Sequence, residues 1–191
     1  MSFPILLYRL GILGLLLAAG VFWTDPLRSS LARHPEELAG VVLLFGFPVV
    51  VGLIALFLTP ERLKKNAGPF ILLLNGVSLL SLVWLMLWCW IWLPIVSGLG
   101  NPALAGHLAL FHLFGLGLVL AAYVSAWMTP VRGQKAARFV MAAGWAVSYA
   151  SLVNIWIYAQ MKEPPGFLWA PAVGGLLTAV GAFLVFRKIE D

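Results

Sequence analysis

Two histidines within one long apolar stretch are the side chains of this chain best suited to hold a metal or a pigment. His107 and His112 are five positions apart. Five residues of α-helix turn through about 500°, so the two rings point about 140° apart. They are therefore poorly placed to bind one metal ion together. They also cannot hold a haem between them, because its two axial ligands come from opposite faces.

Each of these imidazoles could still act alone or with His34, the third histidine of the chain. His34 and His107 both fall on the predicted outer side, which leaves a bis-histidine haem open. A single histidine is enough to ligate the magnesium of a chlorophyll-type tetrapyrrole. The commonest role is a hydrogen-bonded histidine at a helix interface, and we expect that role for His107 and His112.

Tryptophan side chains supply the second candidate site. Three of the nine tryptophans recur every four residues, which places them on one face of a helix. Tryptophan is enriched at membrane interfaces, because its ring is apolar and its N–H is polar. An interfacial belt or packing against a partner is the commoner interpretation, and an outward-facing pocket for a flat or apolar ligand is the alternative. The residues that would line this pocket are Trp84, Trp88, Trp92, His107, His112 and Asn154.

Acidic residues are missing from every long apolar stretch. The seven Asp and Glu residues all lie between these stretches or at the C-terminus. Proton- or ion-coupled carriers keep acids within their spans, and membrane hydrolases need acids, paired metal ligands or a Ser/Lys pair. No HExxH, GxSxG, GxGxxG or P-loop pattern occurs. We therefore expect no self-contained enzyme, no catalytic residue and no metal site.

The composition predicts an integral membrane protein. Of 191 residues, 62% are hydrophobic and 10% are charged, whereas a soluble domain carries about 25% charged residues. A helical span needs about 20 apolar residues, and these stretches lack the alternation of a β-barrel. We predict an all-α bundle of six transmembrane helices, forming a single transmembrane domain over residues 1–191. The predicted spans are 4–23, 38–58, 69–95, 104–128, 136–160 and 168–186.

Basic residues gather in segments that lie on one side of this six-span topology. Two basic turns and the C-terminal segment contain Arg62, Lys64, Lys65, Arg132, Lys135, Arg138, Arg187 and Lys188. Short basic loops stay in the cytoplasm, so we expect a bacterial inner (cytoplasmic) membrane protein with both termini in the cytoplasm. Because the charges are split among three short segments, they do not predict nucleic-acid binding. We expect them to contact anionic lipid headgroups.

The two basic turns belong to a longer internal similarity. Thr59–Lys65 and Thr129–Lys135 share Thr, Pro, Arg and Lys at the same spacing, and ten identities lie within 59–83. This pattern predicts a tandem repeat of helical hairpins, spans 2–3 and 4–5, related by an axis along the membrane normal. Hydroxyls at equal depth in the two copies commonly bond a backbone carbonyl or a neighbouring helix. These hydroxyls belong to Ser78, Ser81, Ser148 and Ser151.

Small residues recur every four positions on the last two spans. They are Ala142, Ala146 and Ala150 on one span and Gly174, Thr178 and Ala182 on the other. Such faces let helix backbones approach closely. They fit packing within one bundle and docking onto another membrane protein equally well.

These features favour a non-catalytic integral subunit of a larger respiratory or photosynthetic membrane complex. Its role would be scaffolding, with a tetrapyrrole, a quinone or lipid held at the Trp-rich face beside other integral membrane subunits. The alternative is a substrate-binding component of a small-solute transporter. In size and span count the chain is similar to the vitamin-binding S-components of energy-coupling-factor transporters, which implies an outward-facing pocket. A b-type haem redox anchor is the third possibility.

Overall fold

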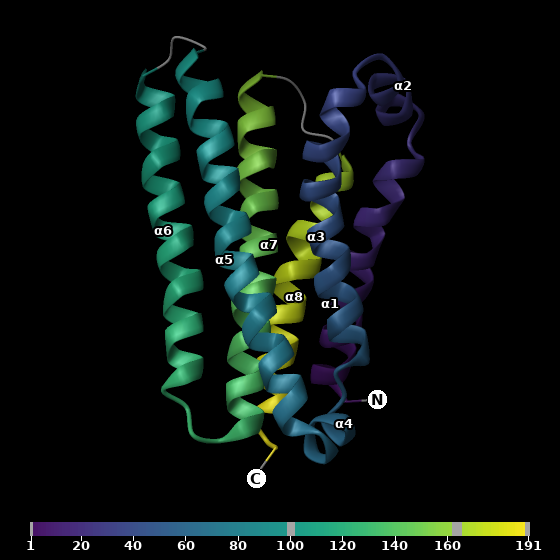
Figure 1. Ribbon diagram of the computed structural model, residues 1–191, viewed down its shortest axis with the longest axis vertical. Coiled ribbons are helices and arrows are strands. Elements are labelled where there is room, and N and C mark those ends of the chain that lie inside the picture. Colours follow the sequence, from purple (N-terminus) through teal and green to yellow (C-terminus); the bar gives the residue numbers. More distant parts are fainter. Residues whose placement is uncertain (1, 99–101, 162–165, 190–191) are drawn as a thin grey trace.

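The computed structural model describes residues 2–98, 102–161 and 166–189. Helices and connecting turns account for these residues, with no strand among them. The long helices run side by side along one axis (Figure 1). They are α1 (Phe3–Leu17), α3 (Leu38–Phe57), α5 (Ala67–Gly98), α6 (Pro102–Trp127), α7 (Arg132–Met161) and α8 (Trp169–Phe186). The short elements are η1 (Ala18–Trp23), α2 (Asp25–Arg33), η2 (Pro35–Glu37), α4 (Pro60–Lys65) and η3 (Gly166–Leu168).

Six helical segments in the described part of the chain are long and apolar enough to cross a membrane, as predicted. Their bounds are Phe3–Val21, Leu38–Phe57, Ala67–Trp88, Ala103–Trp127, Arg132–Gln160 and Gly166–Phe186. When η1 is counted with α1, no helix end differs from a predicted span end by more than four residues, the largest difference being at Arg132. The prediction of six long apolar helices is therefore confirmed for the described residues.

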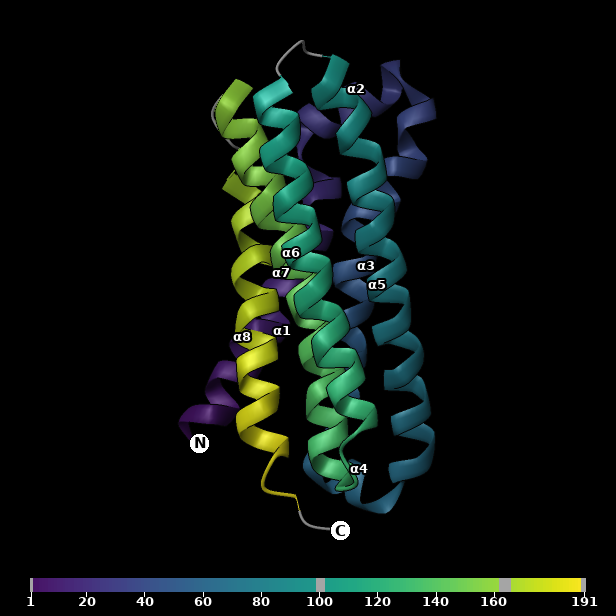
Figure 2. The ribbon, with the colours of Figure 1, turned by 90° about the vertical axis from the view of Figure 1, so that its left-hand side faces the viewer.

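Helix α7 occupies the centre of the bundle. Helices α5 and α6 pack on one side of α7, and α8 packs on its other side (Figures 1 and 2). Helix α8 also packs against α1, and α1 contacts α3. Within the 18-residue apolar window of α7, 72% of the residues are buried, compared with 22% in the corresponding window of α6. Helix α7 is thus the common partner of α5, α6 and α8, and α6 lies at the periphery of the bundle.

Glycines set the distance between α8 and its two neighbours. A Cβ on Gly175 would lie 2.5 Å from the carbonyl oxygen of Gly144 in α7, and a Cβ on Gly174 would lie 2.7 Å from the backbone of Gly14 in α1. Real Cβ atoms essentially never approach other atoms so closely. The predicted small-residue face of α8 therefore lies inside the bundle. The alanine face of α7 is buried as well: Ala142, Ala146 and Ala150.

The two predicted hairpins differ in geometry. Helices α6 and α7 pack against each other, whereas α3 and α5 diverge from α4 and make few contacts (Figure 1). The hydroxyl of Thr59 caps α4 by accepting a hydrogen bond from the Arg62 N–H at 3.3 Å. The hydroxyl of Thr129, its counterpart, donates instead to the carbonyl of Ser125 at 2.7 Å. The shared Thr-Pro sequence thus forms two different turns.

Replacing Gly175 by alanine should destabilise the bundle, because the added methyl group meets the carbonyl oxygen of Gly144. We expect a loss of about 1–3 kcal/mol in the free energy of unfolding, the usual cost of overpacking. Gly117→Ala on α6 is the control, since a Cβ there meets nothing within 4 Å and alanine favours a helix. Thermal unfolding of both variants in one detergent measures the difference. Equal melting temperatures would contradict the close crossing of α7 and α8.

Candidate functional site

The two histidines of α6 lie in different environments, as their spacing predicts. His107 is exposed, whereas only 4% of the surface of His112 is exposed. His112 lies on the face of α6 that packs on α7, between Leu108 and Gly115, which is close to the ring of Tyr149. Neither ring nitrogen of His112 has a hydrogen-bond partner in the described part of the chain. The location agrees with a histidine at a helix interface, but the expected hydrogen bond is missing.

His34 lies on the opposite side of the bundle from His107 and His112. It is exposed, and its Nδ1 lies 3.3 Å from Oε1 of Glu36. His34 directly follows α2, and α2 and α6 lie on opposite sides of the bundle (Figures 1 and 2). The structure therefore does not bring His34 and His107 together, and a haem held by this pair has no geometric support.

Trp84 and Trp88 lie in the interior of the bundle. Their exposed fractions are 3% and 7%. The ring of Trp84 stacks on Phe47 of α3 with centroids 4.8 Å apart, and it meets the ring of Trp88 edge-on at 6.3 Å. Both tryptophans belong to one packed cluster with the alanine face of α7. An interfacial belt does not account for them, and the side chain of Trp92 lies outside the described part of the structure.

Trp88 and His112 lie at about the same height on neighbouring helices. The Tyr123 hydroxyl donates to Oδ1 of Asn75 at 2.9 Å, which fixes the register of α6 against α5. Trp88 is thirteen residues beyond Asn75, and His112 is eleven residues before Tyr123. At a rise of 1.5 Å per residue, these separations are about 20 Å and about 17 Å. Trp88 Nε1 is also buried without a hydrogen-bond partner among the described residues, and we call these two side chains the ring-nitrogen pair.

The ring-nitrogen pair offers hydrogen-bond donors and one acceptor to a ligand. An indole N–H only donates, and a neutral imidazole carries one donor and one acceptor. Leaving such buried groups unpaired costs about 1–3 kcal/mol each, so a ligand that pairs with them gains that free energy. A quinone carbonyl could accept from either N–H, and the imidazole of His112 could ligate the metal of a tetrapyrrole. The residue types therefore fit both classes of ligand.

Asn154 and Ser151 of α7 each bond a carbonyl group of their own helix, whereas Ser148 does not. Asn154 is 1% exposed, and its Nδ2 donates to the carbonyl of Ala150 at 2.7 Å. Ser151 donates to the carbonyl of Val147 at 2.8 Å, as expected. Ser148 lies against Gly175 of α8, and its hydroxyl has no partner among the described residues. The Nδ2 bond of Asn154 thus stabilises α7 itself, at the buried centre of the bundle.

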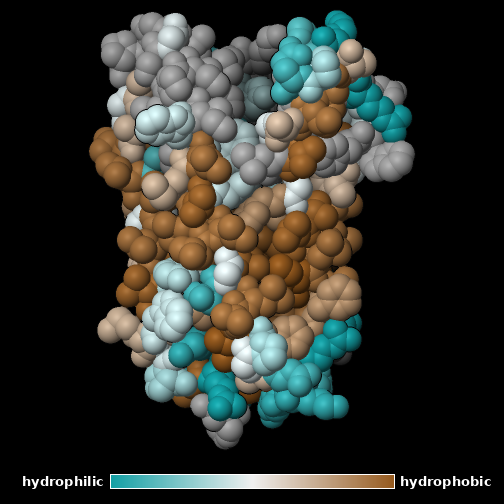
Figure 3. Space-filling view, in the orientation of Figure 1, coloured by the Kyte–Doolittle hydropathy of each residue, from teal (hydrophilic) through white to brown (hydrophobic). Residues whose placement is uncertain are grey.

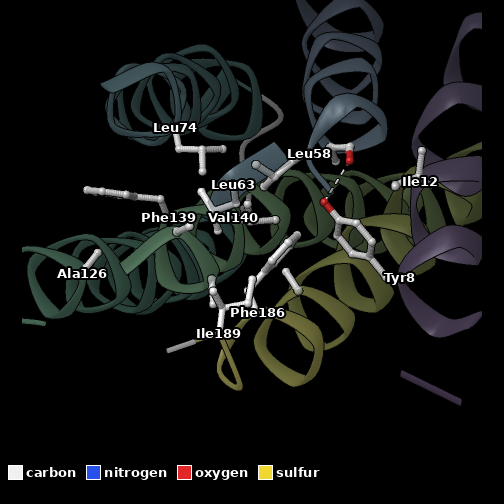
Figure 4. Packing of buried hydrophobic residues seen from close by; sticks show 14 residues of the cluster. Tyr8, Ile12, Leu58, Leu63, Leu74, Ala126, Phe139, Val140, Phe186 and Ile189 are labelled. Atoms are coloured by element: carbon white, nitrogen blue, oxygen red, sulfur yellow. Dashed lines mark hydrogen bonds between the residues drawn. The ribbon is translucent and has the colours of Figure 1, made fainter. Parts of the chain in front are cut away.

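Two buried hydroxyls connect helices across the bundle. The Ser78 hydroxyl on α5 lies 2.8 Å from the carbonyl oxygen of Leu74 and 2.7 Å from that of Phe139 on α7. The Tyr8 hydroxyl on α1 donates to the carbonyl of Ala55 on α3 at 3.0 Å (Figure 4). Hydrogen bonds between helices in a membrane contribute about 0.6–2 kcal/mol each. These polar groups therefore stabilise helix packing.

Basic side chains lie at one end of the bundle, which we call the basic end. Helix α4, the α6–α7 turn, the end of α8 and the N-terminal end of α1 meet there (Figure 1). At this end a cation lies over an aromatic ring in the last turn of each of three helices. The pairs are Arg62 and Phe57 at 5.6 Å, Lys135 and Trp127 at 5.8 Å, and Arg187 and Phe183 at 5.5 Å. Exposed rings beside cations are typical of helix ends at a membrane–water boundary.

Two arginines of the basic end also bond carbonyl groups near helix ends. Arg62 Nη1 donates to the carbonyl of Phe57 at 3.2 Å, and Arg138 Nη1 donates to that of Ser125 at 2.9 Å. The last carbonyls of a helix lack partners within it and carry the negative end of its dipole. These arginines therefore stabilise the ends of α3 and α6, a role that the sequence did not indicate.

Among the described residues, no group of three or more His, Cys, Asp or Glu side chains could hold a metal ion. Comparison with protein-family models, curated proteins and solved structures finds no match to this chain. The features that bear on function are thus the packed polar interior, the ring-nitrogen pair and the basic end.

Ser78→Ala should destabilise the bundle more than Ser81→Ala. Both serines are fully buried on α5, but among the described residues Ser81 bonds only the carbonyl of Val77 in its own helix, at 2.7 Å. We expect Ser78→Ala to cost about 0.6–2 kcal/mol, because it removes the bond to α7, and Ser81→Ala to cost less. Chemical denaturation of the two variants in detergent measures both changes. An equal effect of the two substitutions would show that the bond to Phe139 contributes nothing.

Proposed function

We propose that the chain is a non-catalytic integral subunit of a larger membrane complex of the respiratory or photosynthetic, energy-converting kind. The observation that carries this proposal is the use of the buried polar groups. Ser78, Tyr8 and Asn154 bond backbone carbonyls within or between helices. Such bonds build a rigid bundle and supply no acid, base or nucleophile for a reaction. A scaffold fits this chemistry better than an enzyme does.

The outer faces of α5 and α6 would supply the surface for neighbouring subunits. Several large apolar side chains on these faces are highly exposed: Leu72 at 72%, Leu113 at 69% and Phe114 at 63%. In the view of Figure 3, a hydrophobic band crosses the middle of the molecule. In a bilayer such a band contacts lipid or other helices. Other integral subunits and membrane lipids are therefore the partners that we propose.

The basic end would face the cytoplasm of a bacterial inner membrane. All three basic segments meet there, and short basic loops are retained on the cytoplasmic side. The N-terminal end of α1 and the C-terminal end of α8 also lie at the basic end (Figure 1), so the termini would be cytoplasmic. We also propose that the hairpins of spans 2–3 and 4–5 derive from one duplicated unit, whose turns later diverged.

The ring-nitrogen pair favours a second candidate function, the binding of a small apolar ligand. Trp88 Nε1 and both nitrogens of His112 are buried and unpaired in the described structure. A quinone, a pigment or the solute of a transporter could pair with them. A b-type haem anchor would use His112 as one axial ligand and would need the second ligand from a partner subunit.

A photo-cross-linking residue at position 113 should capture a neighbouring subunit, whereas one at position 108 should not. Leu113 is 69% exposed and Leu108 is fully buried on the same helix, so position 108 is the matched control. We expect one cross-linked product of constant mass from native membranes and a native particle heavier than the 20.8 kDa chain. A monomer that carries out turnover, with no cross-link from either position, would refute the scaffolding role.

If the ring-nitrogen pair binds a quinone, a short-chain benzoquinone should quench the tryptophan fluorescence of the purified chain. His112→Leu should weaken this binding about tenfold, because one hydrogen bond to the ligand is lost. His107→Leu should leave it unchanged, since His107 is exposed on another face of α6. Titration of all three proteins in one detergent gives the dissociation constants. The same weak quenching in all three would rule out this site for quinones.

A further inference from the structure

One face of α5 is exposed over the depth of a membrane. Its large apolar side chains follow one another at intervals of three, four or seven positions: Leu72, Leu79, Val83, Met86 and Trp90. Such intervals place side chains on one side of a helix, and between 46% and 78% of each of these side chains is exposed. From the first to the last the helix rises about 27 Å, which is close to the thickness of the hydrocarbon core.

Helix α6 continues this exposed face beside α5 (Figures 1 and 2). Leu113, Leu120 and Trp127 recur every seven positions and are 69%, 48% and 55% exposed. A period of seven keeps side chains on one seam when helices pack with a left-handed supercoil. Neither α5 nor α6 contains an acidic or a basic residue, so a second pair of the same helices would meet no like charge here.

Asn75 places a polar group on this apolar surface. Its side chain is half-buried where α5 meets α6, and its Oδ1 accepts a hydrogen bond from the Tyr123 hydroxyl at 2.9 Å. Its Nδ2 group, which carries two donors, has no hydrogen-bond partner in the described part of the chain. In the view of Figure 3, hydrophilic residues interrupt the lower part of the hydrophobic band over these two helices. Lipid tails accept no hydrogen bond, so the free amide favours a protein neighbour.

We propose that the outer faces of α5 and α6 bind a second copy of this chain. The proposal rests on the subunit contacts proposed above for these faces, and it names the neighbour. Two copies with the same orientation in a membrane are related by a two-fold axis along the membrane normal. Each residue near that axis then lies at the depth of its own counterpart. With the axis along the line where α5 meets α6, Asn75 faces Asn75 of the second copy.

The amide of Asn75 is complementary to its own copy, because an asparagine side chain carries both donors and an acceptor. Each Nδ2 donates to Oδ1 of the other copy, and Oδ1 has a second lone pair besides the one that Tyr123 uses. A single asparagine between packed apolar faces fixes the register of two parallel helices in the same way.

The size of the surface also fits a dimer. A strip about 27 Å long and about 20 Å wide, the width of two helices, covers about 540 Å². Two such faces bury about 1,100 Å² in total, slightly above the 1,000 Å² or so that a specific interface needs. A transmembrane helix of another protein would have to supply an acceptor at the depth of Asn75, whereas a second copy supplies it by symmetry.

The pairing of the amides can be tested with the purified chain in bilayers. Single-molecule photobleaching of protein labelled at one end measures the fraction of dimers at several protein-to-lipid ratios. We expect the dissociation constant of the dimer to rise about tenfold in Asn75→Leu, because two hydrogen bonds between the copies are lost. Tyr123→Phe is the matched control: it removes the hydrogen bond within the chain but leaves the amide free to pair, so the dimer should persist.

A disulfide test leaves Asn75 unchanged. Leu79 lies one helical turn beyond Asn75 and is 50% exposed, and Val180 on α8 is 41% exposed. In a chain whose only cysteine is replaced by Cys89→Ala, Leu79→Cys should form a disulfide-linked dimer in oxidised membranes. Val180→Cys should not, because α8 lies on the other side of α7 from α5 and α6.

Monomers in bilayers, with no disulfide at position 79, would overturn the proposal. Equal dissociation constants for Asn75→Leu and Tyr123→Phe would show that the amides do not pair. If the cross-linked product from position 113 has a mass other than twice that of the chain, another subunit covers this surface. The scaffolding role then stands, and the second copy is ruled out.

Discussion

The close contact of α8 with α1 on one side and α7 on the other is the constraint on which the rest of the bundle depends. Lipid tails are as apolar as leucine, so helices in a membrane gain little from burying apolar surface against each other. Close approach at glycines and interhelical hydrogen bonds have to supply the stability instead. Gly174 faces α1 and Gly175 faces α7, so adjacent residues of α8 hold both neighbours. This contact covers one side of α7, where Ser148 lies against Gly175, and α5 and α6 cover the other side.

The interior of the bundle contains two kinds of polar group. Most of them, such as the hydroxyls of Ser78 and Tyr8, have a carbonyl within hydrogen-bond distance. In the described part of the chain the ring nitrogens of Trp88 and His112, like the hydroxyls of Ser148 and Thr178, are buried without such a partner. The first kind explains why the fold is stable without any acid in its spans. The second kind is where a ligand would change the free energy of the bundle most, because it would pair groups that now have no partner.

Length and composition predicted the six helices, because a bilayer of fixed thickness leaves few ways to arrange long apolar segments. The spacing of His107 and His112 predicts that their rings diverge, since helical rotation is independent of tertiary structure, and the structure exposes one side chain and buries the other. The sequence did not predict whether a helix face that carries several tryptophans points towards lipid or towards another helix. Trp84 and Trp88 could face lipid or protein on sequence alone, and the position of α7 decides for protein.

Contacts between distant segments were also beyond the sequence. The small-residue face of α8 was predicted, but Gly14, its partner on α1, was missed. The spacing of Gly11 and Gly14 within one apolar span was the available signal. The bond from Arg138 to the carbonyl of Ser125 depends on the conformation of the α6–α7 turn. The sequence predicted the position of this turn but not its conformation.

The pairing of α1 with α8 has a consequence for biosynthesis. The two helices are the first and last of those that the structure describes, and about 150 residues separate Leu17 from Trp169. At about 5–20 residues per second, the ribosome needs about 8–30 s to synthesise that interval. During this time the glycine face of α1 has no native partner in the translocon or the surrounding lipid. A nascent chain that stops before α8 therefore leaves Gly11 and Gly14 of α1 without the helix against which they pack in the finished bundle.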